Sequence, residues 1–367
     1  MLSPVLPSTA LRLFSSSVEE AGAQFSRLAS ATPRLLFCDH HVCPAKGPAA
    51  EELFTNVAWL GSDGASKVLV LISGTHGAEG WAGSAVQADF LSEVRQRNWQ
   101  PPTDTAVLLI HALNPWGMAW DRRCDHDGID LNRNFIDFDQ PPPANSGYLA
   151  LRDILMQEDG RARSEGLRQY GEKHGRTALE IAISGGQYSD PAGPFFGGFG
   201  KSHARQLIEK LINDFTLGEK QLAVIDLHTG LGPYGYGEII CDHQPDSDGT
   251  RVARNWYGDA VTLPLAGTSS SVPKLGLMDY GWHAIMHASS CFVTLEYGTY
   301  GTEQLFDTIL ADHKLHATGA IDWSSPHTKR IKDTMRRHFC PPDPQWQEMV
   351  LWRGRQVIRL ALEGLKH

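Results

Sequence analysis

The sequence predicts an α/β protein with a mostly parallel, mixed sheet flanked by helices. Three short, mostly apolar runs, at 68–72, 223–227 and 291–295, have the length and composition of buried strands. Segments with a helical spacing of apolar residues lie between them, and this alternation is typical of a parallel sheet. With 367 residues, 41% of them hydrophobic, the chain is long enough for a large core, and we expect one domain over 1–367.

The first part of the chain is expected to alternate between helix and strand. A helix over 15–31 is indicated by Ser17, a good N-cap, with Glu20 three residues later. The other elements expected here are strands at 34–42, 53–60 and 67–73, a helix to about residue 96, and a strand at 106–111.

Residues 136–200 are less regular. Helical patterns at 148–158 and 161–182 are followed by a glycine-rich stretch at 184–200. We interpret this segment either as an insertion that shapes one wall of a site or as a long surface excursion. The elements expected after it are a helix at 202–213, a strand at 222–227, a helix near 248–261, a strand at 291–295, and helices near 303–317 and at 346–365.

Composition narrows the classes of partner. The net charge of −9 argues against nucleic acid or an anionic membrane surface as a partner. No run of 18 apolar residues is present, so we expect no segment that crosses a membrane. The composition does not indicate an oligomeric state.

Cysteine usage favours a reducing compartment. The six cysteines lack closely paired spacings, so we expect free thiols and a cytoplasmic location. A mitochondrial location is the alternative, because Arg12 and the serines at 15–17 resemble part of a transit peptide, although Glu19 and Glu20 interrupt that pattern.

Two predicted strands end in candidate metal ligands. The strand at 67–73 leads to His76 and Glu79 in a glycine-rich turn before a helix, the position where open α/β sheets bind ligands. The strand at 222–227 leads to His228. Two imidazoles and one carboxylate are the ligand set of catalytic zinc sites, which keep a fourth position open. Cobalt or manganese suits the same ligands.

A third strand end supplies a candidate base. Glu296 follows the apolar run at 291–295, and a carboxylate there either forms a structural ion pair or takes a proton from water. We favour the role of general base and acid.

The stretch 122–135 contains side chains suited to an anion. Asn132 and Arg133 offer an amide and a guanidinium for a substrate carboxylate. Arg123, or its neighbour Arg122, is a candidate for stabilising the oxyanion formed by attack on a carbonyl. A solvated charged loop is the alternative interpretation.

Taken together, these motifs resemble the zinc carboxypeptidase superfamily, which includes succinylglutamate desuccinylase and aspartoacylase. The resemblance covers nearly the whole chain from about Phe14, and the stretches SGTHGAEGWAGSAVQ and DLNRNF resemble most a poorly characterised carboxypeptidase-like branch. The residues that carry it, in order, are His76, Glu79, Asn114, Pro115, Arg123, Asp130, Leu131, Asn132, Arg133, His228 and Glu296.

The resemblance implies a zinc carboxypeptidase-like (phosphorylase/hydrolase-like) fold and specific roles for these side chains. One Zn²⁺ per chain would be bound by His76, Glu79 and His228. Glu296 would activate the water and Arg123 would polarise the carbonyl. Asn132 and Arg133 would hold a substrate carboxylate, and Asp130 would orient His76. A substrate-capping tyrosine is also implied; Tyr280 is the candidate, and Tyr234, Tyr236 and Tyr297 compete with it.

The function expected from the resemblance is hydrolysis of an amide bond in a small-molecule or peptide substrate with a free carboxylate. A carboxypeptidase is the first interpretation, and a deacylase of N-acyl amino acids is the alternative. A catalytically inactive metal- or ligand-binding relative is a further alternative, since a fold alone does not determine function. A serine hydrolase is disfavoured, because no Gly-x-Ser-x-Gly motif occurs at a strand–helix turn.

Overall fold

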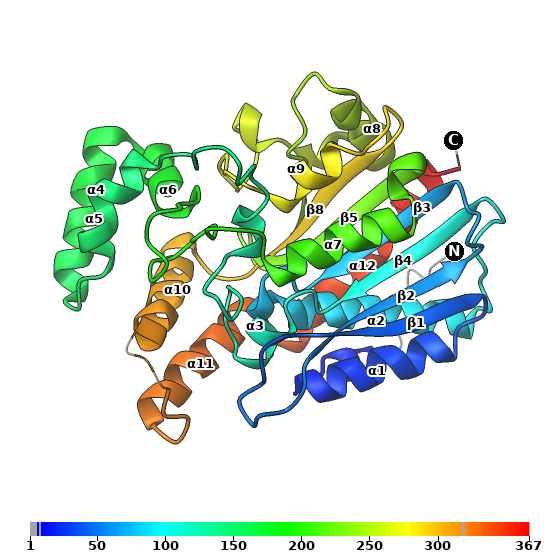
Figure 1. Ribbon diagram of the computed structural model, residues 1–367, viewed down its shortest axis with the longest axis horizontal. Coiled ribbons are helices and arrows are strands. Elements are labelled where there is room, and N and C mark those ends of the chain that lie inside the picture. Colours follow the sequence, from blue (N-terminus) through cyan, green and yellow to red (C-terminus); the bar gives the residue numbers. More distant parts are fainter. Residues whose placement is uncertain (1–5, 7–8, 318, 320, 367) are drawn as a thin grey trace.

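The computed structural model describes residues 6, 9–317, 319 and 321–366 and contains one eight-stranded sheet in the order β1-β2-β4-β3-β5-β8-β6-β7 (Figure 1). The pairs β4–β3, β3–β5, β5–β8 and β6–β7 are parallel, and β1–β2, β2–β4 and β8–β6 are antiparallel. The predicted α/β class with a mostly parallel, mixed sheet is therefore confirmed. The strands are β1 (Leu35–Val42), β2 (Phe54–Gly61), β3 (Lys67–Ser73), β4 (Thr105–His111), β5 (Gln221–Gly230), β6 (Gly237–Ile240), β7 (Val261–Thr262) and β8 (Cys291–Gly298).

Helices cover both faces of this sheet. On one face pack α1 (Val18–Ser30), α2 (Gly80–Gln96), α8 (Asp248–Tyr257) and α12 (Pro344–Gly364), and on the other pack α7 (His203–Asp214) and α9 (Met278–His283). Alternate residues of β3 contact the two layers: Leu69 and Leu71 belong to the first, whereas Val70 and Ile72 belong to the second. A strand buried on both faces reads as a continuous apolar run, which is why the central strands were visible in the sequence.

A further group of helices packs where β3 ends and forms its own apolar cluster around Ala78. In Figure 1 these helices lie on the left, away from the layered part of the molecule. They are α4 (Ser146–Leu155), α5 (Gly160–His174), α6 (Arg176–Ser184), α10 (Thr302–Ala317) and α11 (Pro326–Phe339), and α3 (Pro115–Ala119) lies between them and the sheet.

The structure changes several expected elements. The helix expected over 161–182 is two helices, because Gly175 has a φ of 93° and ends α5. Strands β5 and β8 continue past their apolar runs, so His228 and Glu296 lie on strands rather than after them. Ser17 accepts the hydrogen bond from Glu20 N as expected, while the Glu20 carboxylate binds Ser16. The elements β6, β7, α9 and α11 were not expected from the sequence.

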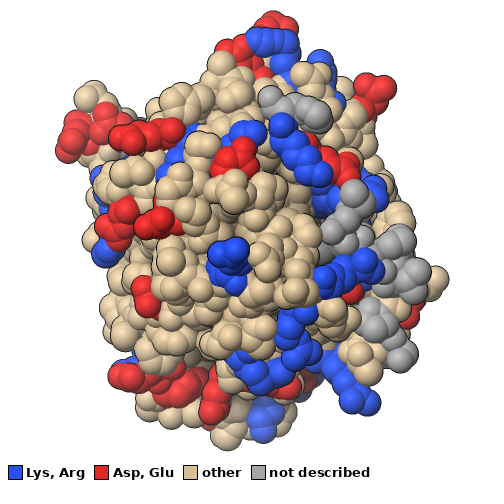
Figure 2. Space-filling view, turned by 90° about the vertical axis from the view of Figure 1, so that its right-hand side faces the viewer, with Lys and Arg blue, Asp and Glu red and all other residues tan. Residues whose placement is uncertain are grey.

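The cysteines agree with the expectation of free thiols. All six cysteines are free. None of the helices in the described part of the chain has the length and apolar character needed to cross a membrane. Acidic and basic side chains both occur on the face shown in Figure 2.

Candidate metal centre and active site

Strand register brings the predicted site residues to one edge of the sheet. Strands β3 and β5 are parallel, with Ser73 beside Leu227, so the turn that carries His76 lies next to the end of β5. Strands β5 and β8 are also parallel, with His228 beside Glu296. The carboxyl ends of three buried strands therefore converge, as in other ligand-binding α/β sheets.

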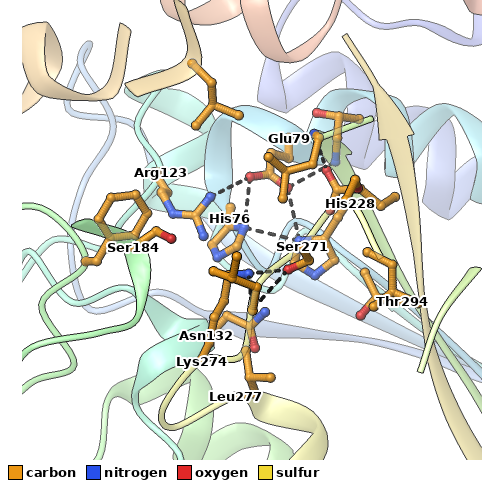
Figure 3. A pocket seen from close by; sticks show the side chains of 18 of the residues that line it. His76, Glu79, Arg123, Asn132, Ser184, His228, Ser271, Lys274, Leu277 and Thr294 are labelled. Atoms are coloured by element: carbon orange, nitrogen blue, oxygen red, sulfur yellow. Dashed lines mark hydrogen bonds and ion pairs between the residues drawn. The ribbon is translucent and has the colours of Figure 1, made fainter. Parts of the chain in front are cut away.

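His76, Glu79 and His228 form a compact, buried cluster, and the ligand atoms that they offer all lie within 4.8 Å of one another (Figure 3). The Nδ1 atoms of the two imidazoles are 3.1 Å apart. The Glu79 carboxylate lies 2.9 Å from His76 Nδ1 and 3.0 Å from His228 Nδ1. Thr229 N donates a further hydrogen bond to Glu79, which holds the carboxylate in place.

Each imidazole contacts a second carboxylate through its other nitrogen. His76 Nε2 lies 3.1 Å from Asp130, and His228 Nε2 lies 2.5 Å from Asp226. An ionised carboxylate only accepts hydrogen bonds, so both Nε2 atoms carry the proton, and a neutral ring then has a lone pair on Nδ1. Two lone pairs and the Glu79 carboxylate consequently face one another.

Such an arrangement of acceptors needs a positive charge between them. Although burial opposes it, Asp226 and Glu79 raise the pKa of His228 well above its ordinary value, so these carboxylates favour a positive charge here, carried either by a proton on the ring or by a metal ion bound to the neutral ring. Two imidazole nitrogens and one carboxylate oxygen, with a carboxylate behind each imidazole, are the donor set of a catalytic zinc site. The residues present thus fit the metal that the resemblance implies.

Arg123 and Arg122 point in different directions. Arg123 lines the cavity beside the cluster and donates to Asp130 at 2.8 Å and to Glu79 at 2.9 Å. Arg122 is buried and pairs with Asp312 of α10 at 2.8 Å. Of the two candidates, only Arg123 lines the cavity that contains the metal-binding cluster.

Glu296 lines the same cavity and is held by the backbone, since its Oε1 accepts a hydrogen bond from Leu231 N at 2.8 Å. Burial, followed by the charge of Glu79, raises the pKa of Glu296 to about 7. His228 and Arg123 act in the opposite direction. A carboxylate with a pKa near neutrality is suited to accept and return a proton.

The cavity is bounded by several elements besides the strand ends. Glu180 and Ser184 of α6 and Phe195 come from the irregular segment at 136–200, so this segment does form part of one wall. The other lining residues include Thr229, Leu231, Ile240, Asp242, Ser270, Ser271, Val272, Lys274, Leu277, Thr294, Thr302, Leu305 and Phe306.

Asn132 and Arg133 border the cavity but differ in accessibility. Asn132 is half-buried, and its Oδ1 accepts a hydrogen bond from Met278 N. Arg133 is 0% exposed, and its guanidinium donates to the carbonyls of Ser184 and Asn132. The structure therefore places the expected carboxylate-binding arginine behind the wall rather than on its surface.

The structure does not bring the candidate tyrosines into the cavity. Tyr280 donates its hydroxyl hydrogen bond to the carbonyl of Lys274 and faces another depression on the surface. Tyr297 is buried, Tyr234 pairs with Asp343, and Tyr236 is exposed. None of the four lines the cavity that contains the metal-binding cluster.

Asp226 and Lys274 are among the polar residues near the site that the sequence did not predict. Asp226 had a detectable signal, because residues i and i+2 of a strand point to the same side, so Asp-x-His presents both side chains together. Lys274 had no such signal in the sequence, since it lies in an irregular loop and reaches the cavity only through long-range contacts.

Fold and site together define an α/β protein with a buried candidate metal centre, made of two histidines and one glutamate, at the carboxyl edge of its sheet. Residues 14–353 match the model of the family described as "Protein of unknown function (DUF2817)", and the chain belongs to that family. No curated protein matches this chain in sequence.

Among solved structures, the chain is similar to carboxypeptidase A from Helicoverpa armigera, with 15% identity over 96% of this chain and 74% of that one and a TM-score of 0.49. It is also similar to bovine thrombin-activatable fibrinolysis inhibitor, with 11% identity, coverage of 96% and 99%, and a TM-score of 0.48. Succinylglutamate desuccinylase from Chromobacterium violaceum has 14% identity, coverage of 87% and 74%, and a TM-score of 0.37. The function proposed below is derived from the side chains of this chain.

Proposed function

We propose that this protein is a zinc-dependent hydrolase that cleaves an amide bond in a substrate with a free carboxylate. The observation that carries the proposal is the convergence of His76 Nδ1, His228 Nδ1 and the Glu79 carboxylate beside a cavity that also contains Glu296 and Arg123. A nucleophile activator, an oxyanion stabiliser and a metal-binding cluster are the components that hydrolysis of an unactivated carbonyl requires.

In the proposed mechanism, Glu296 takes a proton from a water molecule as that water attacks the amide carbonyl. Bound zinc would supply Lewis-acid chemistry, lowering the pKa of water and polarising the carbonyl oxygen. Arg123 stabilises the negative charge that develops on that oxygen through N–H groups beyond the two that bind Asp130 and Glu79. Glu296 then gives the proton to the leaving nitrogen, so that one amide and one water yield a carboxylic acid and an amine.

Asp130 and Asp226 act in this proposal by orienting the imidazoles of His76 and His228. They fix the proton on each Nε2 and direct each Nδ1 toward the metal position. Thr75 donates to Asp226 at 2.8 Å and holds that carboxylate in turn.

A carboxypeptidase is the first candidate for the reaction. Deacylation of an N-acyl amino acid is the second candidate. A wall formed by Glu180, Ser184 and Phe195 that limits the cavity to small substrates would favour this reaction. Rates on N-acyl amino acids and on peptides of increasing length separate the two. Equal rates on long peptides and on acyl amino acids would contradict a size limit.

The primary experiment is the zinc content of the purified protein, for the wild type and for His76→Ala. We expect about one zinc per wild-type chain and loss of that zinc in the variant, because two ligands do not suffice for a tight site. The control is His287→Ala, because His287 is an exposed histidine. This variant should have the same zinc content as the wild type.

Catalysis is tested with Glu296→Gln in the zinc-loaded protein. This variant should keep the metal and lose hydrolysis of carboxyl-bearing amides by about 100-fold or more, since a general base typically contributes that much. A wild-type protein without zinc, or full activity in Glu296→Gln, would disprove the proposed mechanism.

A further inference from the structure

Two cations that border the cavity form no close ion pair with a carboxylate of the described residues. Arg123 contacts both Glu79 and Asp130, so its charge is balanced. In the part of the chain that the structure describes, neither Arg133 nor Lys274 has a carboxylate oxygen within 4.0 Å. Burying an unpaired charge is costly, so two such groups beside one cavity indicate a binding function.

Arg133 lies just behind the wall. Its Nε and Nη2 atoms donate to the carbonyl of Ser184 at 3.0 Å and 2.8 Å. It is 0% exposed, so it adds positive potential to the cavity without offering a surface to a substrate.

Lys274, by contrast, is half-buried and reaches the cavity. Its ammonium donates to Ser271 Oγ, drawn in Figure 3, and to the carbonyl of Val272 at 2.9 Å. An ammonium has three N–H donors, so one is left for a ligand. Burial, with a contribution from Arg133, lowers the pKa of Lys274 to about 8. The charged ammonium is therefore destabilised, and a bound anion would relieve this destabilisation.

The loop that carries Lys274 is fixed to the same support as Arg133. Leu275 N donates to the carbonyl of Gly185 at 2.8 Å, next to the Ser184 carbonyl that binds Arg133. Phe135 N donates to the carbonyl of Gly276, and a Cβ at Gly276 would lie only 2.2 Å from the carbonyl oxygen of Arg133. The ammonium is thus held near the buried guanidinium.

We propose that Lys274 is the side chain that binds the substrate carboxylate, with the buried charge of Arg133 supporting it from behind. This assignment rests on the proposed hydrolase function and revises the expectation that Arg133 itself makes the contact. Asp242 lines the same wall and opposes an anion, and among the described residues it has no Lys or Arg nitrogen within 4.0 Å. The carboxylates of Asp242 and Glu296 offset part of the charge of Lys274 from a distance, while the remaining N–H donor of Lys274 stays directed to a ligand.

The test compares Lys274→Met, which keeps the length of the side chain, with Lys274→Arg, which keeps its charge. Substrates are a panel of N-acetyl amino acids and the same compounds as primary amides. For the acids, Lys274→Met should raise KM about tenfold or more with little change in kcat, the loss expected for one hydrogen bond to a charged group. For the amides it should change KM less than about twofold, and Lys274→Arg should restore part of the preference for acids.

Binding without turnover keeps this test separate from the proposed function. Calorimetry in the Glu296→Gln background, with and without Lys274→Met, measures affinity for each acid and its amide even if no amide is hydrolysed. The matched control is Lys329→Met, an exposed lysine of α11, which should leave both affinities unchanged. Equal binding of acids and amides by the parent protein, or an equal loss of both in Lys274→Met, would overturn the assignment.

Discussion

At the scale of single residues, the candidate site depends on carboxylates behind the metal-binding histidines. Asp226 contacts His228 Nε2 and Asp130 contacts His76 Nε2, so each imidazole presents Nδ1 to the cluster. We predict that Asp226→Asn weakens zinc binding by about 10- to 100-fold, because an amide neither fixes the tautomer nor adds negative charge. Competition with a chromophoric chelator measures this affinity. The exposed Asp246 provides the control Asp246→Asn, and unchanged affinity in Asp226→Asn would contradict the role.

Glu296 predicts a pH dependence. Burial and the charge of Glu79 raise its pKa to about 7, and only the ionised form accepts a proton. Activity should therefore fall as the pH drops through the pKa of Glu296. Bound zinc shifts this fall in activity to lower pH, because a nearby positive charge favours the ionised carboxylate. The dependence of kcat/KM on pH for the zinc-loaded protein measures it. A profile that is flat from about pH 8 down to about pH 5 would exclude Glu296 as the base.

At the scale of elements, a buried ionic cluster joins the 122–135 stretch to α10 and α11. Asp312 of α10 binds Arg122 at 2.8 Å and Lys332 of α11 at 2.5 Å, and all three side chains are buried. Although burial opposes it, Lys332 and Arg122 hold the pKa of Asp312 well below its usual range. The stabilisation that ionised Asp312 gives the folded protein is hence complete at neutral pH. It declines only as the pH falls below about 3.9, the ordinary aspartate pKa.

Asp312→Asn should lower the free energy of unfolding by about 3 kcal/mol or more, since it leaves two buried cations without their ion-pair partner. Urea denaturation at neutral pH measures the change. The control is Asp307→Asn, because Asp307 lies on the same helix and forms an exposed ion pair. This variant should lower the free energy of unfolding by less than about 1 kcal/mol. Similar losses in both variants would show that the cluster adds nothing beyond a surface pair.

Elements also show what the sequence predicts and what it does not. Strands β3, β5 and β8 were predictable because they are buried on both faces, and their ends identified His76, Glu79, His228 and Glu296 as one set. Helix α11 was missed because PHTKRIKDTMRRHF contains few apolar residues, although Ile331, Met335 and Phe339 have the spacing of a helical stripe. Strands β6 and β7 are too short for a periodic signal. Lys274 depends on contacts with residues 185 and 135, which no local pattern records.

At the scale of the whole molecule, the metal site connects distant parts of the chain. His76 and His228 are 152 residues apart in sequence, and only the folded chain brings them together. A ligand that binds the native state but not the unfolded chain stabilises the protein by about 2.7 kcal/mol at a concentration 100 times its Kd. Adding zinc should therefore raise the thermal midpoint of the wild-type protein, and a chelator should reverse the rise. Glu296→Gln, which keeps all three ligands, should respond as the wild type does, whereas His76→Ala should not respond. An equal rise in His76→Ala would place the stabilising metal elsewhere in the molecule and separate it from the proposed chemistry.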